Sequence, residues 1–228
     1  MERTYFLPLA AVALAVAAPA PAFAQDDTQV WTSATVNVKL TDKLKFSNEL
    51  VARFSDTRNG LYELENSALL GYQINKNVSA WAGYVHDPNY SEGDLTAMER
   101  RAREQLVFDN VAAVGKAKFG ARLRMEQRWR DGIDGTGWRM RPYVKMAVPL
   151  GGPKALTFNL SHESFINLNN TSFQTTDGFD RMRNAATLSL PLNDKFKVEA
   201  GYLNQYRFVR RAPDTMDHVL TAAIGLSF

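Results

Sequence analysis

Residues 122–130 read RLRMEQRWR, and every second position in this stretch carries a charge. The charged positions are Arg122, Arg124, Glu126, Arg128 and Arg130. Between them stand three apolar residues and one glutamine, in the order L, M, Q, W. An apolar and polar alternation with a period of two is typical of a β-strand with two different faces. The stretch therefore predicts a strand with one strongly charged face.

The same period of two runs through the rest of the chain. Eleven runs show it, at residues 30–40, 44–54, 62–74, 78–86, 101–114, 118–130, 138–148, 156–167, 181–190, 196–209 and 218–228. Most of these runs are about ten residues long, which exceeds the length of ordinary globular strands. No stretch shows a helical period of useful length, and no linker divides the chain. The sequence predicts an all-β protein with a single domain at residues 25–228.

The connections between the runs fall into two kinds that alternate along the chain. Short connections rich in turn-forming residues lie at 41–43, 75–77, 115, 151–153 and 193–195. Longer polar connections lie at 55–61, 87–100, 131–137, 168–180 and 210–217. Short turns at one end and longer loops at the other are typical of outer-membrane barrels, whose turns are periplasmic and whose loops are extracellular.

Alternation alone does not decide which face contacts water. A soluble sandwich would bury Leu123, Met125 and Trp129, whereas a membrane barrel would turn them to lipid and the arginines to the lumen. Aromatic residues gather towards the ends of several runs, where interfacial girdles lie. The chain also ends LTAAIGLSF, which resembles the C-terminal strand by which outer-membrane barrels are recognised for assembly. We therefore predict a transmembrane antiparallel up-and-down β-barrel that engages the barrel assembly machinery through Phe228.

The number of strands is expected to lie between 10 and 12. Bacterial single-chain barrels have even numbers of strands, so that both ends of the chain lie on the periplasmic side. Eleven runs therefore predict either ten wall strands, with run 30–40 outside the wall, or twelve with one run missed. Twelve is favoured.

The first 24 residues are expected to be a cleaved secretory signal peptide. They combine an early arginine, an apolar stretch and an Ala22-Phe23-Ala24 site, and cleavage is predicted before Gln25. The predicted location is the outer membrane of a Gram-negative bacterium, in contact with lipid and lipopolysaccharide. The absence of cysteine excludes thiolate chemistry, and the net charge of +3 gives no argument for nucleic acid. No cofactor or metal is expected.

In a membrane barrel the charged phase of each run lines the lumen. The predicted lining residues are Arg101, Arg103, Arg122, Arg124, Glu126, Arg128, Arg130, Arg139, Arg141, Lys145, Glu163, Arg181, Arg183, Glu199 and Arg207. Two interpretations remain open. Arginine–glutamate pairs could fill the lumen of a structural barrel, or an excess of arginine could make a small anion-biased channel for anionic solutes. The channel interpretation predicts an anionic conductance that Arg124→Glu or Arg128→Glu weakens.

Several short motifs resemble a known family. The Glu99–Gln105 step, the Arg122–Arg128 core, the Trp138–Tyr143 segment and HESFIN at 162–167 are similar to domain of unknown function 2490, a proteobacterial outer-membrane family. The resemblance covers essentially all of residues 25–228, and it implies a barrel fold and an outer-membrane location but no activity. The arginine-rich wall is also similar to that of small acidic-oligosaccharide porins.

One enzymatic alternative rests on the run 156–167. Its lipid-facing phase includes His162 and Ser164, which are polar residues on a face that should be apolar. This H-x-S step resembles outer-membrane lipases and lipid A deacylases, in which histidine activates serine. Asn184 would lie opposite His162 and orient it if the following loop closes a hairpin. The Asn-Gly that usually follows the serine in such lipases is absent here, so a non-enzymatic barrel is expected.

Overall fold

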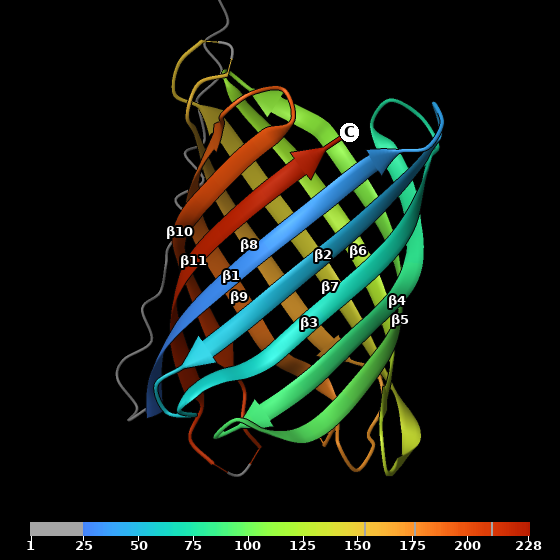
Figure 1. Ribbon diagram of the computed structural model, residues 1–228, viewed down its shortest axis with the longest axis vertical. Helices are drawn as coiled ribbons and strands as arrows, with labels where there is room; N and C mark the ends of the chain where they lie inside the picture. The colour runs from blue at the N-terminus through green and yellow to red at the C-terminus, as the bar shows by residue number, and fades with distance from the viewer. Residues whose placement is uncertain (1–24, 153, 176, 211) are drawn as a thin grey trace, which may run out of the picture.

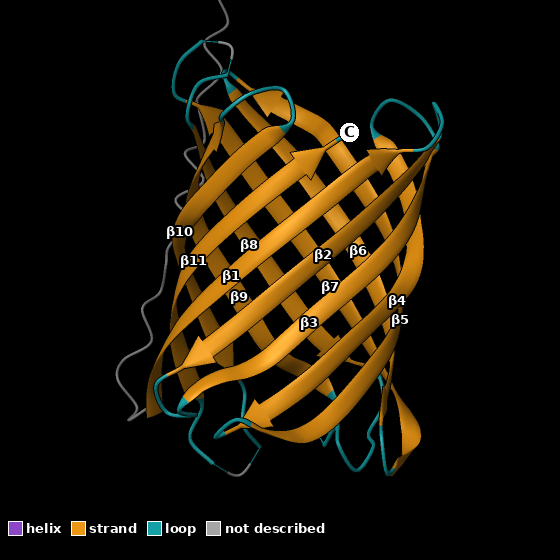
Figure 2. Ribbon diagram, viewed as in Figure 1, coloured by secondary structure: helices purple, strands orange, loops and turns teal. Residues whose placement is uncertain are grey.

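A computed structural model describes residues 25–152, 154–175, 177–210 and 212–228, so the signal-peptide prediction falls outside the described residues. Eleven strands make up the fold (Figure 2). They are β1 (Gln25–Lys39), β2 (Leu44–Ser55), β3 (Gly60–Gln73), β4 (Val78–Ser91), β5 (Asp94–Val114), β6 (Ala117–Arg130), β7 (Ile133–Pro149), β8 (Thr157–Asn167), β9 (Gly178–Pro191), β10 (Phe196–Arg207) and β11 (Thr215–Ser227). No helix long and apolar enough to cross a bilayer occurs among these residues.

The strands close into a barrel in which each pairs with its neighbours in sequence and β1 pairs with β11. The β1–β11 pair is parallel, whereas all other pairs are antiparallel. Figure 1 shows the arrows of β1 and β11 side by side and pointing the same way. The predicted all-β barrel is confirmed, and eleven strands fall within the expected range of 10–12, but the expectation of an even number is wrong. An odd number closes because the first and last strands pair in parallel. Residue 25 and residue 228 therefore lie at opposite ends of the barrel, contrary to the expectation that both ends are periplasmic.

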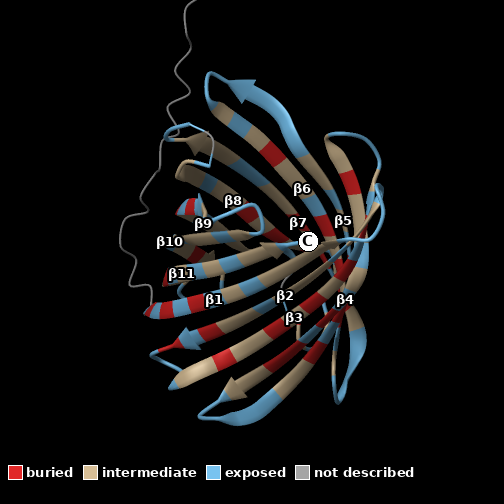
Figure 3. Ribbon diagram, turned by 45° about the horizontal axis from the view of Figure 1, so that its top comes forward, coloured by how far each residue is buried: buried red, intermediate tan, exposed pale blue. Residues whose placement is uncertain are grey.

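Charged side chains point inward and apolar side chains point outward. In RLRMEQRWR, Arg124, Glu126 and Arg128 are buried, whereas Leu123 and Trp129 are 42% and 37% exposed. Buried residues recur as separate bands along the strands (Figure 3), as the two-residue period requires. A charged interior inside an apolar outer belt is the reverse of a soluble barrel and is the pattern of a membrane barrel.

The connections differ in part from those that the sequence predicts. The segments 87–100 and 131–137, expected as long loops, are mostly strand, and the β4–β5 hairpin turns through Glu92 and Gly93 alone. Both residues have positive φ, at 54° and 91°, which a two-residue hairpin turn requires. Glutamate rarely takes that conformation, so the sequence carries no signal for this turn. The β8–β9 connection is the longest, at residues 168–177.

Two inward glycines allow close approach between neighbouring strands. A Cβ on Gly83 of β4 would overlap the backbone carbonyl oxygen of Ala68 on β3. A Cβ on Gly201 of β10 would overlap the backbone carbonyl oxygen of Ala186 on β9. Each glycine precedes an outward tyrosine, Tyr84 or Tyr202, which is 45% or 41% exposed. The recurring Gly-Tyr step therefore pairs a tight inner contact with an aromatic outer face.

Candidate functional site

An arginine–carboxylate network occupies the middle of the lumen, and Glu126 lies at its centre. The Glu126 side chain is fully buried and accepts hydrogen bonds from three arginines on two neighbouring strands. Arg103 of β5 donates at 3.1 Å, and Arg139 and Arg141 of β7 donate at 2.6 Å and 2.9 Å. Arginine forks suit this role because several N–H groups can meet one carboxylate in fixed geometry.

The network extends from Glu126 in both directions around the barrel wall. Glu65 of β3 accepts from Arg53, Arg101 and Arg103, at 3.2, 3.3 and 2.7 Å. On the other side, Glu163 of β8 accepts from Arg141 at 2.9 Å and also from Arg122. Strands β2 to β8 are thus tied together through the lumen by shared ion pairs.

Further inward side chains are buried beside the network, and some of them come from strands outside it. They include Gln29 of β1, Tyr62 of β3, Phe165 of β8, Gln205 of β10 and Val219 of β11, each no more than 2% exposed. Tyr62 donates a hydrogen bond to Gln29 at 2.7 Å. Buried side chains from both sides of the barrel therefore narrow the lumen at the level of the network.

The β8–β9 connection covers the network from the loop end. Gln174 is buried and accepts a hydrogen bond from Arg128 at 2.8 Å. The ring of Phe173 lies 5.7 Å from the Arg128 guanidinium and 5.6 Å from that of Arg130. This loop thus covers Arg128 and Arg130 from the loop end.

Three carboxylates, Glu63, Glu65 and Asp87, have oxygens within 4.8 Å of one another, which is a spacing that could hold a metal ion. Arginines already occupy the space between them. Arg53 pairs with Glu63 and Glu65, and Arg101 pairs with Glu65 and Asp87. The cluster is therefore part of the ion-pair network.

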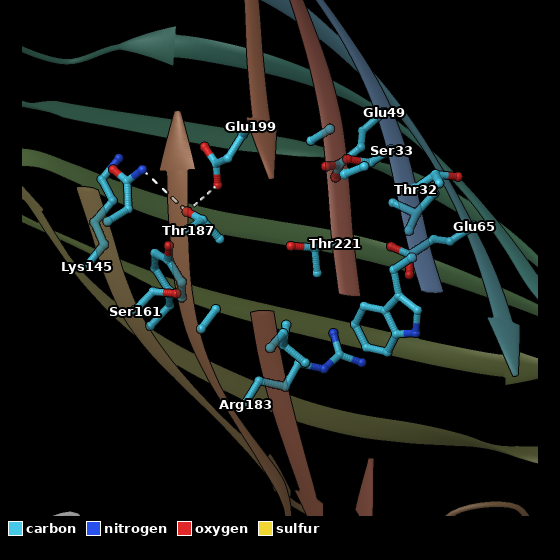
Figure 4. Close-up of a pocket in the computed structure, with 18 of the residues that line it drawn as sticks. Thr32, Ser33, Glu49, Glu65, Lys145, Ser161, Arg183, Thr187, Glu199 and Thr221 are labelled. Carbon is cyan, nitrogen blue, oxygen red and sulfur yellow. Dashed lines mark hydrogen bonds between the residues drawn. The ribbon is translucent and has the colours of Figure 1, made fainter. Parts of the chain in front are cut away.

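A cavity of about 460 Å³ lies between the network and the turn end of the lumen (Figure 4). Its polar lining includes Arg122, Arg124, Lys145, Arg183, Lys197, Glu49, Glu199, Ser161, Thr187, Asn159 and Tyr143. Lys145 and Lys197 lie near the turn ends of β7 and β10, and their side chains are 46% and 56% exposed. The cavity is thus accessible from the turn end and is bounded by cations.

Two arginines of this cavity have no carboxylate partner among the described residues. Arg124 is 7% exposed and donates through Nε to Gln105 at 2.8 Å. Arg183 donates through Nε to Gln205 at 2.8 Å, and its guanidinium lies 4.5 Å from the centre of the Trp31 ring. Arg122 adds a buried Nε that has no hydrogen-bond partner in the described part of the chain. The terminal nitrogens of Arg124 and Arg183 make no hydrogen bond within the described residues, whereas a terminal nitrogen of Arg122 pairs with Glu163.

The predicted lining residues all belong to the inward phase of their strands. Eight are buried around the network: Arg101, Arg103, Arg124, Glu126, Arg128, Arg139, Arg141 and Glu163. Arg122, Lys145, Arg183 and Glu199 line the cavity. The other three lie nearer the loop end, where Arg130 pairs with Glu99, Arg181 with Asp180 and Arg207 with Asp217.

Sequence reasoning missed several inward residues. Asp87 and Glu99 lie in a segment that was expected to be a loop, and Asp27 and Asp217 lie beyond the ends of the expected runs. All four are buried in the lumen wall, so the excess of basic over acidic residues is smaller than the sequence suggests. Trp31 was also missed as a lumen residue, because its aromatic ring fits the lipid face as well as the interior. Extending each period-two run to the next turn residue would have found the four acids.

A separate polar cluster lies on the outer face. His162 Nε2 lies 2.9 Å from Ser164 Oγ on the same strand. His162 Nδ1 lies 2.7 Å from Oδ1 of Asn184, its register partner on β9. The three residues that the enzymatic alternative singles out are therefore in direct contact.

Together these features define a membrane-type β-barrel with a packed, arginine-rich lumen. Residues 28–216 match the family described as protein of unknown function DUF2490, and the chain belongs to this family. An uncharacterised protein of Methylorubrum extorquens is 30% identical over 215 residues, which cover 91% of each chain. Among solved structures, the siderophore receptor PirA from Pseudomonas aeruginosa matches 75% of this chain at 15% identity with a TM-score of 0.26. The match covers 35% of that receptor, and a likeness this weak carries no inference about function.

Proposed function

We propose that this protein is an outer-membrane barrel with a closed lumen that binds a small anionic solute in the cavity facing the turns. The apolar outer belt and the C-terminal strand ending in Phe228 support the location, with the turn end periplasmic. The solute would then enter from the periplasm. The basic cavity supports a ligand that carries a carboxylate or a phosphate group.

The unpaired guanidinium groups of Arg124 and Arg183 carry this proposal. Burying a charged group without a partner costs several kcal/mol, whereas a bound counter-ion offsets much of that cost. Two guanidinium groups can each meet an anion with paired N–H donors. Ser161, Thr187 and Asn159 line the same cavity and supply neutral hydrogen-bonding groups suited to hydroxyls of a polar solute.

The packed layer around Glu126 supports a closed barrel over an open anion channel. A conducting path would have to cross residues that are no more than a few per cent exposed, including Arg103 and Glu126. Rings of arginine select anions only where water accompanies them through the pore. The arginines of the network are engaged with carboxylates, whereas Arg124 and Arg183 of the cavity have no carboxylate partner among the described residues.

Binding can be followed through Trp31, because its ring contacts Arg183 in the cavity wall. We expect glucuronate and inorganic phosphate to change the tryptophan fluorescence of the purified barrel in detergent, and neutral glucose to leave it unchanged. Arg183→Gln and Arg124→Gln should each weaken anion binding by about tenfold or more, because each removes charge-assisted hydrogen bonds of about 1.5–3 kcal/mol. Arg100→Gln is the matched control, since this exposed arginine pairs with Asp131 outside the lumen.

Two results would contradict the proposal. If the wild type and the double variant Arg124→Gln/Arg183→Gln bind both anions with equal affinity, the luminal cavity is not the binding site. A steady anion-selective current through planar bilayers that contain the wild-type protein would show that the barrel is an open channel. The expected result is a silent bilayer together with saturable anion binding.

A further inference from the structure

The His162 cluster has the order of groups that activates a serine. Asn184 Oδ1 accepts a hydrogen bond from the protonated Nδ1 of His162 at 2.7 Å. This bond leaves the Nε2 lone pair free to accept the Ser164 hydroxyl hydrogen at 2.9 Å. A nucleophile in contact with a base, and a base oriented by a third group, is the arrangement on which serine hydrolysis depends.

Other polar residues on the outer face do not form this arrangement. The Tyr202 hydroxyl pairs with Nδ1 of His218 at 2.6 Å, and Asn48 pairs with Asn66 at 3.3 Å. The first is a two-member contact, and Asn48 adds only a hydrogen bond to the backbone carbonyl of Ser67. Such contacts lower the cost of a polar group facing lipid. Within the described residues of the outer face, only His162 joins a hydroxyl on one ring nitrogen and an amide on the other.

The cluster faces the bilayer in the half of the barrel nearer the loops. Ser164 is three residues from the loop end of β8 at Asn167, and Met182 lies opposite it on β9. The side chain of Ser164 is only partly buried, so a molecule in the surrounding lipid layer can reach it. The ester bonds of membrane lipids lie near the boundary between headgroups and acyl chains, so an ester can meet Ser164 from the outer leaflet.

An apolar groove of about 550 Å³ begins at Leu188 and Leu190 of β9, further towards the turns, and extends across β10, β11 and β1. Small residues, Ala200 and Ala222, form part of its lining, together with larger ones such as Leu188 and Val198. Leu188 is four residues from Asn184 along β9, or about 13 Å at 3.3 Å per residue. A fatty acyl chain held at Ser164 and directed towards the turn end would meet the β9 side of this groove, at Leu188.

We propose that Ser164, His162 and Asn184 form a catalytic triad that hydrolyses an acyl ester of a membrane lipid. Ser164 Oγ attacks the ester carbonyl carbon, and His162 Nε2 takes the hydroxyl proton. The bond between the carbonyl carbon and the alcohol oxygen breaks, and His162 gives the proton to that oxygen, so the alcohol leaves. Water then attacks the acyl-serine with His162 as base, the bond to Oγ breaks, Oγ regains the proton, and the fatty acid is released.

The surroundings of Ser164 indicate slow turnover. No lysine or arginine contacts Ser164 in the described part of the structure, and its cross-strand neighbour is Met182. A single oxyanion donor contributes about 10²–10³-fold to kcat in hydrolases that have one. Water or lipid headgroups must stabilise the oxyanion here, so we expect the rate to fall below that of hydrolases with a built oxyanion site by about this factor.

The test uses the purified full-length barrel in mixed micelles of detergent and dioleoyl phosphatidylethanolamine. Released oleate is measured by mass spectrometry, and a fluorophosphonate probe reports the reactive serine independently of turnover. We expect wild-type protein to release oleate and to carry the probe on Ser164. Ser164→Ala should lose both signals, and Asn184→Ala should lower both by at least tenfold.

Asn204→Ala is the matched control, because Asn204 is the register partner of Asn184 on β10 and does not contact His162. It should keep both signals, as should Arg100→Gln, since this exposed arginine pairs with Asp131 and belongs to neither proposed site. Retained oleate release in Ser164→Ala, or probe labelling no stronger in the wild type than in Ser164→Ala, would overturn the triad. The cluster would then be another polar contact on the outer face. If Ser164→Ala does not fold, the comparison of Asn184→Ala with Asn204→Ala decides the matter.

Discussion

Glu126 shows how a single residue can hold the interior of this barrel together. Its carboxylate is shared by Arg103, Arg139 and Arg141, and water does not reach it. Removing one partner of a buried ion pair leaves the other charges uncompensated, which costs more than the pair itself contributes. The stability of the barrel should therefore depend on this one side chain more than on any exposed ion pair.

We expect Glu126→Gln to lower the free energy of unfolding by about 3–5 kcal/mol, because three arginines then lose their common counter-charge. The measurement is the urea midpoint of the purified barrel in detergent, followed by heat-modifiable mobility on gels. Asp42→Asn is the control, since Asp42 pairs with Lys39 in an exposed turn and its loss should leave the midpoint unchanged. Equal midpoints for Glu126→Gln and the wild type would show that the network adds nothing to stability.

The residues of the proposed triad can be picked out in the sequence because they are polar at positions where the alternation predicts apolar residues. His162 and Ser164 break the apolar phase of their strand, and Asn184 breaks that of the next strand. The sequence could not establish their contact, because the register between β8 and β9 depends on where the intervening loop closes. The structure pairs His162 with Asn184 directly.

At the scale of strands, the Gly-Tyr steps set how closely neighbours approach. Gly83 and Gly201 point inward, where a side chain would meet backbone atoms of the next strand. Backbone cannot rotate away as a flexible side chain can, so the strands themselves would have to move. The long charged side chains nearby require the lumen wall to keep its local curvature.

Gly83→Ala and Gly201→Ala should each destabilise the barrel by about 1–3 kcal/mol, which is the usual cost of overpacking. Gly225→Ala is the matched control, because its nearest neighbouring atom would be 3.9 Å from the new Cβ. Thermal unfolding of the three variants, followed by circular dichroism, gives the comparison. A common melting temperature for all three would contradict close strand approach at the two glycines.

The hairpin β4–β5 shows where strand prediction fails. Its polar residues were expected to form a loop, yet Asp87 and Glu99 face each other across the pair and enter the ion-pair network. Polar composition usually indicates a connection, but in a charged lumen polar residues continue the inner face of a strand. Composition therefore underestimates strand length wherever the interior is charged.

For the molecule as a whole, the parallel pairing of β1 with β11 decides the topology. It places residue 25 and residue 228 at opposite ends of the barrel and makes an odd number of strands possible. The pairing is continuous from Gln25 opposite Thr215 to Asn37 opposite Ser227. Closure in this way leaves no strand edge free along that span.

A cysteine pair tests this closure, because the chain has no cysteine of its own. Ser33 and Ala223 are register partners across the parallel pair, so Ser33→Cys/Ala223→Cys should form a disulfide on oxidation. Ser33→Cys/Val219→Cys is the control, since Val219 pairs four residues away with Gln29, about 13 Å along the strand. A non-reducing gel should show a mobility shift in the first variant alone. A shift only in the control would mean a different register, and a shift in neither variant would contradict direct pairing of β1 with β11.

The sequence by itself determined the period of each strand, and with it which side chains share a face. The charged face of RLRMEQRWR, the single domain and the barrel class follow from that period, because side chains alternate across a strand regardless of its neighbours. Only the tertiary structure decided the strand number, the packed lumen and the unpaired Arg124 and Arg183. These depend on register and closure, which bring together residues from strands far apart in the chain, and no local pattern records them.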